Sequence, residues 1–279
     1  MRAISIINLK GGVAKTTTAV NMAYLLAKGG NKVLIVDNDK QGNTSKAFGL
    51  YDPNDKDNAA RAMLDQNVAL IDLAASTRYQ NLDIIPANMD LLEANLRVIA
   101  DVSRPQQTRF KKAIEKRSVN AEMLPGVTPE SAAQYYDYII FDNAPDLNMS
   151  IINALVVSDD VIVPVEIDQF SFDGLDILLE QIGQIKEDFN DKINFAGCLI
   201  TKYRAREDVQ NQGAAVLEDC YKVFKQRIRQ TENKPKESTF AKIPLVEYSV
   251  RCGASQDYKR FVAEYLDQIG GAGNVKEKG

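Results

Sequence analysis

The stretch Ile4-Ser-Ile-Ile-Asn-Leu-Lys-Gly-Gly-Val-Ala-Lys-Thr-Thr-Thr18 decides the fold of this 279-residue chain. An apolar run leads into a glycine-containing turn, and hydroxyl residues then open a helical stretch. In that order, the turn and the start of the helix direct backbone N–H groups toward bound phosphates. The pattern predicts that Lys15 reaches the β- and γ-phosphates of a nucleotide and that Thr16 ligates Mg²⁺. The predicted phosphate cradle comprises Gly11, Gly12, Val13, Ala14, Lys15, Thr16 and Thr17.

The match to the pattern GxxxxGK[ST] departs at two positions. Leu9 stands where the pattern has its first glycine, and Ala14 stands where it has the glycine before the lysine. If position 14 needs a positive φ, alanine costs about 1–2 kcal/mol there. The methyl group of Ala14 would also lie close to a bound phosphate.

Short apolar runs alternate with helical stretches along the chain. The runs are continuous in Val, Ile and Leu, as in strands buried on both faces of a parallel sheet; they cover Ala3–Ile7, Val33–Val36, Tyr138–Phe141, Val161–Val165 and Ile193–Thr201. Helices are expected at Thr16–Lys28, Leu91–Ala100, Ser150–Ser158, Phe172–Phe189, Asp208–Arg229 and Ser255–Ile269. The alternation predicts an α/β fold with one doubly wound, mostly parallel sheet flanked by helices. We expect a single domain over residues 1–279, with an insertion that contains a helix at 101–130 and a flexible tail at 270–279.

Carboxylates follow two of the predicted strands. Asp37 and Asp39 come at the end of the second strand, and Asp142 comes at the end of the third. The carboxyl ends of parallel strands meet at one edge of the sheet, where such sheets bind ligands. We expect Asp39 to orient an attacking water and Asp37 to support the water shell of a metal ion. Asp142 fits the carboxylate held near Mg²⁺ in nucleotide hydrolases, although an aspartate at a strand end is also a common helix cap.

Composition excludes several classes of protein. Hydrophobic residues make up 45% and charged residues 26%, an ordinary globular balance. No apolar run is long enough to span a membrane or to act as a secretory signal. The chain has no histidine, which excludes histidine-based zinc sites and Ser-His or Cys-His catalysis. The cysteines are widely spaced, so we expect reduced thiols in a cytoplasmic protein; they are Cys198, Cys220 and Cys252.

Positive charge gathers in the C-terminal third. Residues 202–260 carry 13 Lys or Arg and 8 Asp or Glu, a balance of +5 in a chain whose net charge is −4. Such a region can bind phosphate backbones, and a solvated helix face of mixed charge explains it equally well. The candidate DNA contacts are Lys222, Lys225, Arg227, Arg229 and Arg251.

Three motifs, KGGVAKTT, VLIVDNDKQGN and YDYIIFDNAP, resemble those of the ParA/Soj family of partition ATPases, within the deviant Walker A class that also includes MinD. Weaker similarity continues through residues 81–88, 161–166, 172–175 and 241–244. The resemblance implies slow, Mg²⁺-dependent hydrolysis of ATP governed by Asp39. It implies an ATP-dependent sandwich homodimer in which Lys10 reaches the nucleotide of the other subunit. Pro244 would pack by the adenine, with Leu245 in place of the family's arginine, and Lys40 replaces the family's proline.

The same resemblance implies partners for the chain. The ATP-bound dimer would bind double-stranded DNA without sequence preference, a ParB-like adaptor would stimulate hydrolysis, and no membrane would be involved. The protein would then be cytoplasmic, and on the nucleoid when ATP is bound.

Four other functions share parts of this site. A membrane-cycling protein like MinD would need a basic amphipathic C-terminal helix, whereas the helix predicted at Ser255–Ile269 has mixed charge. An iron–sulfur reductase would need cysteines placed to bridge two subunits. A metabolic ATP-dependent ligase or kinase would need a second substrate pocket. An interaction scaffold whose ATP binding is impaired by Ala14 is the fourth alternative.

Overall fold

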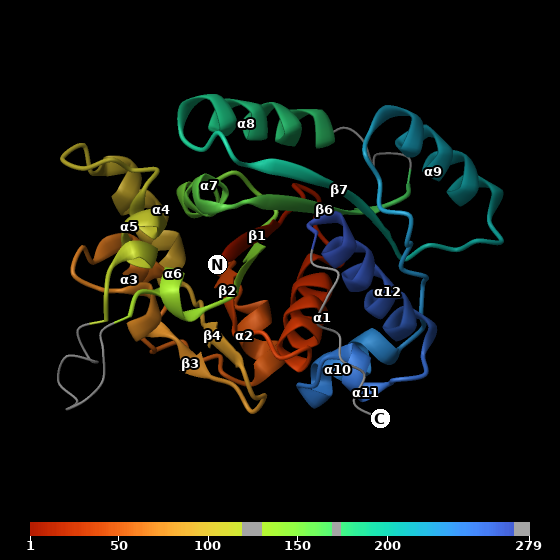
Figure 1. Cartoon of the computed structure of the whole chain (residues 1–279), viewed down its shortest axis with the longest axis horizontal. Coiled ribbons are helices and arrows are strands. Elements are labelled where there is room, and N and C mark those ends of the chain that lie inside the picture. Colours follow the sequence, from red (N-terminus) through yellow and green to blue (C-terminus); the bar gives the residue numbers. More distant parts are fainter. Residues whose placement is uncertain (119–129, 169–173, 271–279) are drawn as a thin grey trace.

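The structure is a computed structural model that describes residues 1–118, 130–168 and 174–270. Within these residues, seven strands form one sheet in the order β3-β4-β2-β5-β1-β6-β7 (Figure 1). All pairings are parallel except that of β3 with β4. The strands are β1 (Arg2–Ile6), β2 (Val33–Asn38), β3 (Ala75–Ser76), β4 (Leu82–Ile85), β5 (Tyr138–Asn143), β6 (Asp160–Glu166) and β7 (Asn194–Thr201). The predicted mostly parallel, doubly wound sheet is confirmed.

Helices cover both faces of this sheet. The helices α1 (Lys15–Lys28), α11 (Leu245–Tyr248) and α12 (Gly253–Gln268) pack on one face. The other face carries α3 (Ala59–Leu64), α4 (Asp90–Ala100), α5 (Arg109–Glu115), α7 (Met149–Val157) and α8 (Leu175–Asp188) (Figure 1). The remaining elements are α2 (Asn43–Phe48), the 3₁₀ helix η1 (Leu70–Leu73), α6 (Ala132–Tyr135), α9 (Asp208–Cys220) and α10 (Lys234–Ala241).

The central strand β5 shows why the apolar runs are continuous. Ile139 and Phe141 point into the core under α3, α4, α5 and α7, while Ile140 points into the core under α1 and α12. Successive side chains of a strand face opposite sides of the sheet, so both sides of β5 must be apolar. No helix in the described part of the chain is long and apolar enough to span a membrane.

The last helix is tied to the first strand through a buried carboxylate. Asp160, at the start of β6, is fully buried and accepts hydrogen bonds from Arg2 Nε at 2.6 Å and from Tyr265 Oη at 2.8 Å. Tyr258 Oη also lies 3.2 Å from Thr18 Oγ1 in α1. These contacts join β1, β6, α1 and α12 into one unit.

The helix predicted at Asp208–Arg229 is wrong in its second half. The helix α9 ends at Cys220, and residues 221–230 run as an extended chain parallel to β7. Backbone bonds join Phe224 N to Cys198 O at 2.9 Å and Ile228 N to Ile200 O at 2.8 Å. This pairing satisfies the outer edge of β7, and it buries Phe224 and Ile228 against α12. The contacts that stabilise this extended segment join residues far apart in the sequence. The local sequence pattern does not contain them, and for that reason it indicated a helix.

The segment predicted as an insertion contains α5, which is part of the core. Phe110 in α5 stacks on Phe141 of β5, with ring centroids 5.6 Å apart. Residues 119–129 of that segment lie outside the described residues, as do the predicted start of the helix at Phe172 and the predicted tail from 271 onward. The strands β3 and β4 and the short helices around them were not expected from the sequence.

Candidate nucleotide-binding site

The loop between β1 and α1 holds two residues in the left-handed conformation. Gly12 has φ 79°, and Ala14, the N-cap of α1, has φ 65° and ψ 29°. No side chain caps this helix end, so the first N–H groups of α1 remain available for an anion, which the helix dipole also favours. A Cβ atom added at Gly11 or Gly12 would meet no protein atom within 4 Å. The loop is therefore open on the side where a phosphate would bind.

Lys15 lies just behind this loop. Its side chain is largely buried, and its Nζ donates to the backbone oxygen of Lys10 at 2.9 Å. Burial lowers the pKa of Lys15, while the negative charges of Asp142 and Asp39 act to raise it. The ammonium group is thus held at the loop by a neutral acceptor and by nearby carboxylates.

Asp142, at the end of β5, has one oxygen with a partner and one without. Its Oδ2 accepts a hydrogen bond from Thr44 Oγ1 at 2.6 Å, while the buried Oδ1 has no hydrogen-bond partner. Burial raises the pKa of Asp142 to about 6, while the hydrogen bond from Thr44, the nearby hydroxyl of Thr16 and the charge of Lys15 act to lower it. A buried carboxylate oxygen without a partner is costly, and a metal-bound water would satisfy it.

Asp37 lies beside Asp142, but its carboxylate is hydrogen-bonded to the start of α2. The two are register partners across β2 and β5. Asp37 Oδ2 accepts from Ser45 N at 2.8 Å and from Ser45 Oγ at 2.7 Å, which fixes the first turn of α2. Burial and the charge of Asp142 raise its pKa. A role for Asp37 in the water shell of a metal would require it to give up Ser45.

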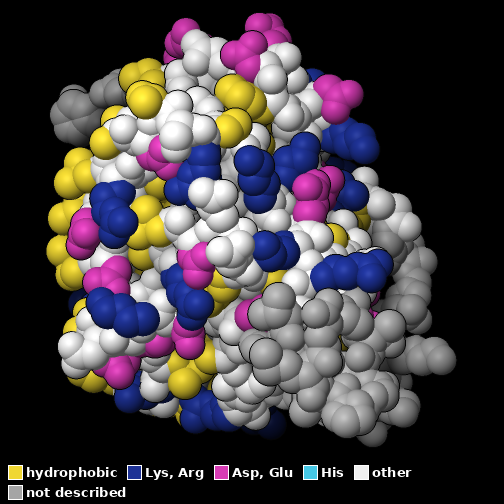
Figure 2. Space-filling model, turned by 90° about the vertical axis from the view of Figure 1, so that its left-hand side faces the viewer, with side chains coloured by type: hydrophobic (Ala, Val, Ile, Leu, Met, Phe, Trp, Pro, Cys, Tyr) yellow, Lys and Arg dark blue, Asp and Glu magenta, His cyan; other side chains and the backbone are white. Residues whose placement is uncertain are grey.

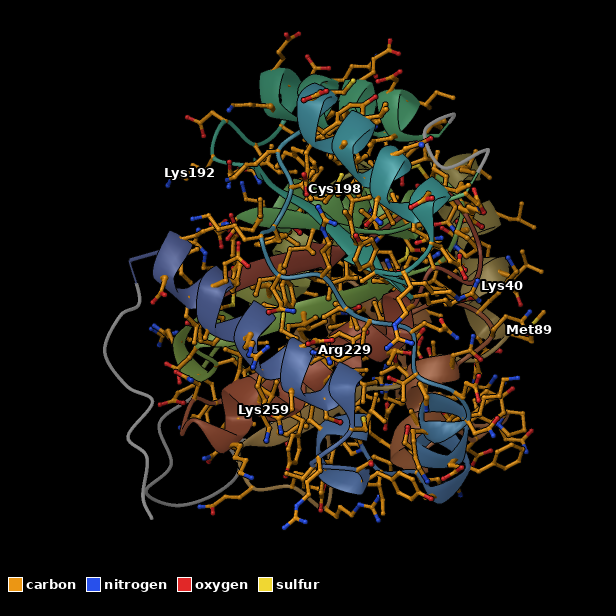
Figure 3. The ribbon with its side chains drawn as sticks, turned by 90° about the vertical axis from the view of Figure 1, so that its right-hand side faces the viewer. Lys40, Met89, Lys192, Cys198, Arg229 and Lys259 are labelled. Atoms are coloured by element: carbon orange, nitrogen blue, oxygen red, sulfur yellow. The ribbon has the colours of Figure 1, made fainter. Side chains whose placement is uncertain are left out.

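Asp39 and its neighbours form the rim of the site. Asp39 is partly exposed, and its Oδ1 accepts from Gln41 N at 2.9 Å in a tight turn that leads to α2. Lys40 lies 3.7 Å from Asp146, which follows β5. Lys40 and Lys192 lie on opposite sides of Figure 3, because Lys40 follows β2 at the carboxyl edge of the sheet and Lys192 precedes β7 at the amino edge.

The side chain of Lys10 pairs with a residue outside the phosphate cradle. Its ammonium group forms an ion pair with Asp168, which follows β6. Its backbone N–H donates to Asn8 Oδ1 at 2.8 Å, and Asn8 in turn donates to the oxygen of Pro164 at 2.8 Å. The loop is thereby anchored to β6, and the partly exposed Lys10 side chain lies at the surface.

Pro244 directly precedes α11 and lies beside α1. Leu245, which stands where the resembling family has arginine, is 1% exposed and packs in the core under α12. Val246 N donates to Asn21 Oδ1 of α1 at 2.9 Å. The side chain at position 245 therefore cannot reach a ligand outside the protein.

The candidate DNA contacts lie on the extended segment 221–230 and before α12, and they differ in their partners. Lys222, Lys225 and Arg251 are exposed, and no ion pair is formed by them among the described residues. Arg229, which is labelled in Figure 3, binds the buried Asp257 with two hydrogen bonds of 2.7 Å. Arg227 pairs with Glu218. Two of the five positive charges are therefore neutralised within the protein.

A pocket lies away from this site, at the amino edge of the sheet. It has a volume of about 410 Å³ and none of the candidate residues lines it; its walls are Lys32, Ser76, Thr77, Arg78, Tyr79, Gln80, Asn81, Asp83, Tyr135 and Tyr136. Ligands of doubly wound sheets bind at the carboxyl edge, so the loop and carboxylates above remain the candidate site.

The structure brings most of the predicted site residues to one edge of the sheet, together with two residues that the sequence did not single out. Gly11–Thr17, Asp37, Asp39 and Asp142 all lie at the carboxyl edge of β1, β2 and β5. Thr44 and Ser45, which hold the two buried carboxylates, were not singled out. Their only signal was their position shortly after Asp39.

Comparisons with known proteins identify relatives of the chain. The family model of the AAA domain matches residues 1–195. The sporulation initiation inhibitor protein Soj of Bacillus subtilis (strain 168) is 35% identical over 228 residues, which is 82% of either chain. The chromosome partitioning protein ParA of Caulobacter vibrioides (strain NA1000 / CB15N) is 28% identical over 270 residues, covering 96% of this chain and 95% of that protein.

A solved structure shares the fold over nearly the whole chain. Cobyrinic acid a,c-diamide synthase from Mycobacterium smegmatis, solved with a bound ATP analogue and magnesium, superposes with a TM-score of 0.77 and 23% identity, and the match covers 98% of each chain. That likeness concerns the fold alone. The match over residues 1–195 and the identity to Soj show that the chain belongs to the ParA/Soj family of partition ATPases.

Proposed function

We propose that this chain is a ParA-like ATPase of a DNA-partitioning system. It binds ATP with Mg²⁺, forms an ATP-dependent homodimer, and binds double-stranded DNA without sequence preference. Slow hydrolysis of ATP, stimulated by a ParB-like adaptor, releases the protein from the DNA. The observation that carries the proposal is the buried, unpartnered Oδ1 of Asp142 beside Lys15 and Thr16, behind an open loop at a helix N-terminus.

The residues present fit ATP and Mg²⁺. Bound Mg²⁺ supplies positive charge that neutralises the phosphates and the developing charge of the transferred group. Thr16 would offer its hydroxyl to the ion, and Asp142 Oδ1 would accept a hydrogen bond from an ion-bound water. No cluster of three or more metal-binding side chains exists in the described part of the chain. That fits an ion which takes most of its ligands from phosphate and water.

The two lysines of the loop have different tasks. Lys15 is already at the loop, and it would exchange the carbonyl of Lys10 for a phosphate oxygen, a stronger acceptor because it is charged. Lys10 would have to leave Asp168 to reach the nucleotide of a second subunit. Asp168 therefore acts as a resting partner that keeps Lys10 away from its own site.

Asp39 is the residue we assign to water positioning. It is partly exposed at the rim, and its Oδ1 makes only a local turn contact with Gln41 N. It can therefore turn toward a water without leaving a buried group unpaired. Asp37 and Asp142 are both fully buried and held by α2 residues, which makes them poorer candidates for that task.

The first experiment compares Lys15→Ala and Asp39→Ala with the wild type and with Lys28→Ala, a surface lysine at the far end of α1. Binding of a fluorescent ATP analogue with Mg²⁺ and steady-state phosphate release are both measured. Lys15→Ala should lose productive binding, because it removes the charge at the loop. Asp39→Ala should bind normally but stall hydrolysis and accumulate as a dimer. Turnover equal to that of the wild type in either variant would remove the role assigned to that residue.

A second experiment separates the DNA function from ATP binding. Fluorescence anisotropy of random-sequence duplex DNA is followed with Mg²⁺ and ATP, ADP or no nucleotide. We expect binding with ATP alone, because the switch depends on the dimer. Identical curves in all three conditions, together with normal ATP binding, would favour the scaffold or the metabolic ligase over a partition protein.

A further inference from the structure

Two buried carboxylates at the strand ends bind consecutive hydroxyl residues of α2. Asp37 Oδ2, at the end of β2, accepts a hydrogen bond from Ser45 Oγ at 2.7 Å, and Asp142 Oδ2, at the end of β5, accepts one from Thr44 Oγ1 at 2.6 Å. All four residues are at most 1% exposed. A hydrogen bond to an ionised carboxylate is stronger than one between neutral groups. The start of α2 is therefore tied to both strands at the candidate site.

Thr44 decides which oxygen of Asp142 remains available. The hydroxyl of Thr44 occupies Oδ2, and the buried Oδ1 has no hydrogen-bond partner. The terminal torsion of an aspartate has broad, roughly two-fold wells, so a hydrogen bond is needed to select which oxygen points where. Lys15 attracts the carboxylate of Asp142, and without Thr44 either oxygen would be free to turn toward that charge. The hydrogen bond from Thr44 thus orients Oδ1.

The hydroxyl of Thr44 is itself held in a fixed position. The helix α2 begins after Gly42, whose φ is 64°. A Cβ atom added at Gly42 would lie 2.7 Å from the backbone oxygen of Ala87, so the chain lies close against the segment after β4. Ala87 N also donates to Ser45 Oγ at 3.0 Å, which adds a contact to the one between Ser45 and the end of β2. Because these contacts fix the first turn of α2 from two sides, Thr44 orients Asp142 rather than following it.

We propose that Thr44 is a positioning residue for Mg²⁺ at the candidate nucleotide site. Its hydrogen bond holds Asp142 Oδ2, so that Oδ1 is left to accept from an ion-bound water when ATP and Mg²⁺ are bound. The inference rests on the proposed function, because it requires that this site binds ATP with Mg²⁺. Partners that orient the groups around a metal ion contribute to its affinity. Thr44 therefore contributes to the binding of Mg²⁺ and not to the binding of the nucleotide alone.

The test is a titration of Mg²⁺ at a fixed concentration of a fluorescent ATP analogue, with binding of the analogue as the signal. Thr44→Val removes the hydroxyl and keeps the branched shape, whereas Thr44→Ser keeps the hydroxyl. Thr44→Val should raise the Mg²⁺ concentration at half saturation about tenfold, the lower end of the effect of such outer partners of a metal site. Its affinity for the analogue in EDTA should equal that of the wild type. Thr44→Ser should behave like the wild type in both measurements.

Thr77→Val is the matched control. Thr77 Oγ1 donates to the backbone oxygen of Leu82 at 2.7 Å in the connection between β3 and β4, so the same substitution removes a hydrogen bond at the amino edge of the sheet, away from the site. It should lower Tm without changing the dependence of analogue binding on Mg²⁺. Neither substitution changes a charge. Weak binding of Mg²⁺ to surface carboxylates, which are intermixed with Lys and Arg side chains on the face that Figure 2 shows, therefore affects all variants alike.

The outcomes separate this inference from the proposed function. A wild type without Mg²⁺-dependent binding of the analogue refutes the proposed function, and the inference with it. If the wild type binds and Thr44→Val has the same or a lower half-saturation concentration of Mg²⁺, the inference alone is overturned. An equal loss of affinity with and without Mg²⁺, or a Thr44→Ser variant as impaired as Thr44→Val, also overturns it, because either result shows a purely structural role. Thr44→Ala, which removes the hydroxyl with less bulk, gives the same test if Thr44→Val does not fold.

Discussion

Replacing Ala14 by glycine should stabilise the protein, which is the reverse of the usual effect at a helix start. Ala14 has φ 65° and ψ 29°, a conformation that costs an L-residue with a Cβ about 1–2 kcal/mol. Glycine removes this cost but gives the unfolded chain more freedom, which takes back about 0.4–1 kcal/mol. The net gain expected from Ala14→Gly is therefore about 0.5–1 kcal/mol. Removing the methyl group also opens the loop for a phosphate.

Thermal unfolding of the nucleotide-free protein measures this gain. For a domain of this size, 1 kcal/mol corresponds to roughly 2–4 °C in Tm, so we expect a rise of about 1–4 °C. Gly12→Ala is the matched control two residues earlier. Its added Cβ would meet no atom within 4 Å, and its φ is 79°, so it should lose stability from backbone strain alone. Affinity for ATP with Mg²⁺ should rise in Ala14→Gly and fall in Gly12→Ala.

Two results would refute this reasoning. If Gly12→Ala is destabilised while Ala14→Gly is unchanged or less stable, position 14 carries no strain. If neither variant changes Tm, the loop does not keep these dihedral angles in solution.

Three further predictions concern charge. Burial raises the pKa of Asp142 from 3.8 to about 6, so the folded protein keeps a proton that the unfolded chain releases. The stability of the nucleotide-free protein should therefore fall as pH rises from about 4 to 6. The Tm of Asp142→Asn, measured across that range, should fall less than that of the wild type. Arg229→Ala should cost about 1–3 kcal/mol in urea denaturation, because it leaves the buried carboxylate of Asp257 without its charged partner, and a loss below 0.5 kcal/mol would contradict a structural role. Lys225→Ala should leave stability unchanged and reduce the salt slope of DNA binding by about one, whereas an unaltered slope would remove Lys225 from the DNA surface.

Much of the fold could be predicted because its signals are local. The buried strands of a parallel sheet are continuous apolar runs, and the loop at Gly11–Thr17 has a fixed order of residue types. The error at 221–229 has a different origin. Those residues pair with β7 through contacts that depend on Gly197, whose φ is 142° and whose added Cβ would lie 3.2 Å from the backbone oxygen of Lys222. No local pattern reports such an approach.

The candidate site was predictable in position and less so in the state of its groups. The positions of Asp37, Asp39 and Asp142 at strand ends predicted that they lie at one edge of the sheet, but not how their burial and hydrogen bonding differ. The structure separates them: Asp37 holds Ser45, Asp142 keeps one oxygen unpaired, and Asp39 is partly exposed. Burial and hydrogen bonding decide these differences, and both depend on how α2 closes over the strand ends.

The contact of Asp160 with Arg2 and Tyr265 affects how the protein folds during its synthesis on the ribosome. The first strand, β1, pairs with β5 and β6, so it waits unpaired until more than half of the chain has been synthesised. Long-range pairing of this kind folds slowly and exposes apolar segments meanwhile. Tyr265 arrives last and completes the set of hydrogen bonds around a carboxylate that is fully buried. We therefore expect the phosphate loop, which β1 and α1 carry, to become rigid only after α12 has docked, and a chain released earlier to be more open to proteases.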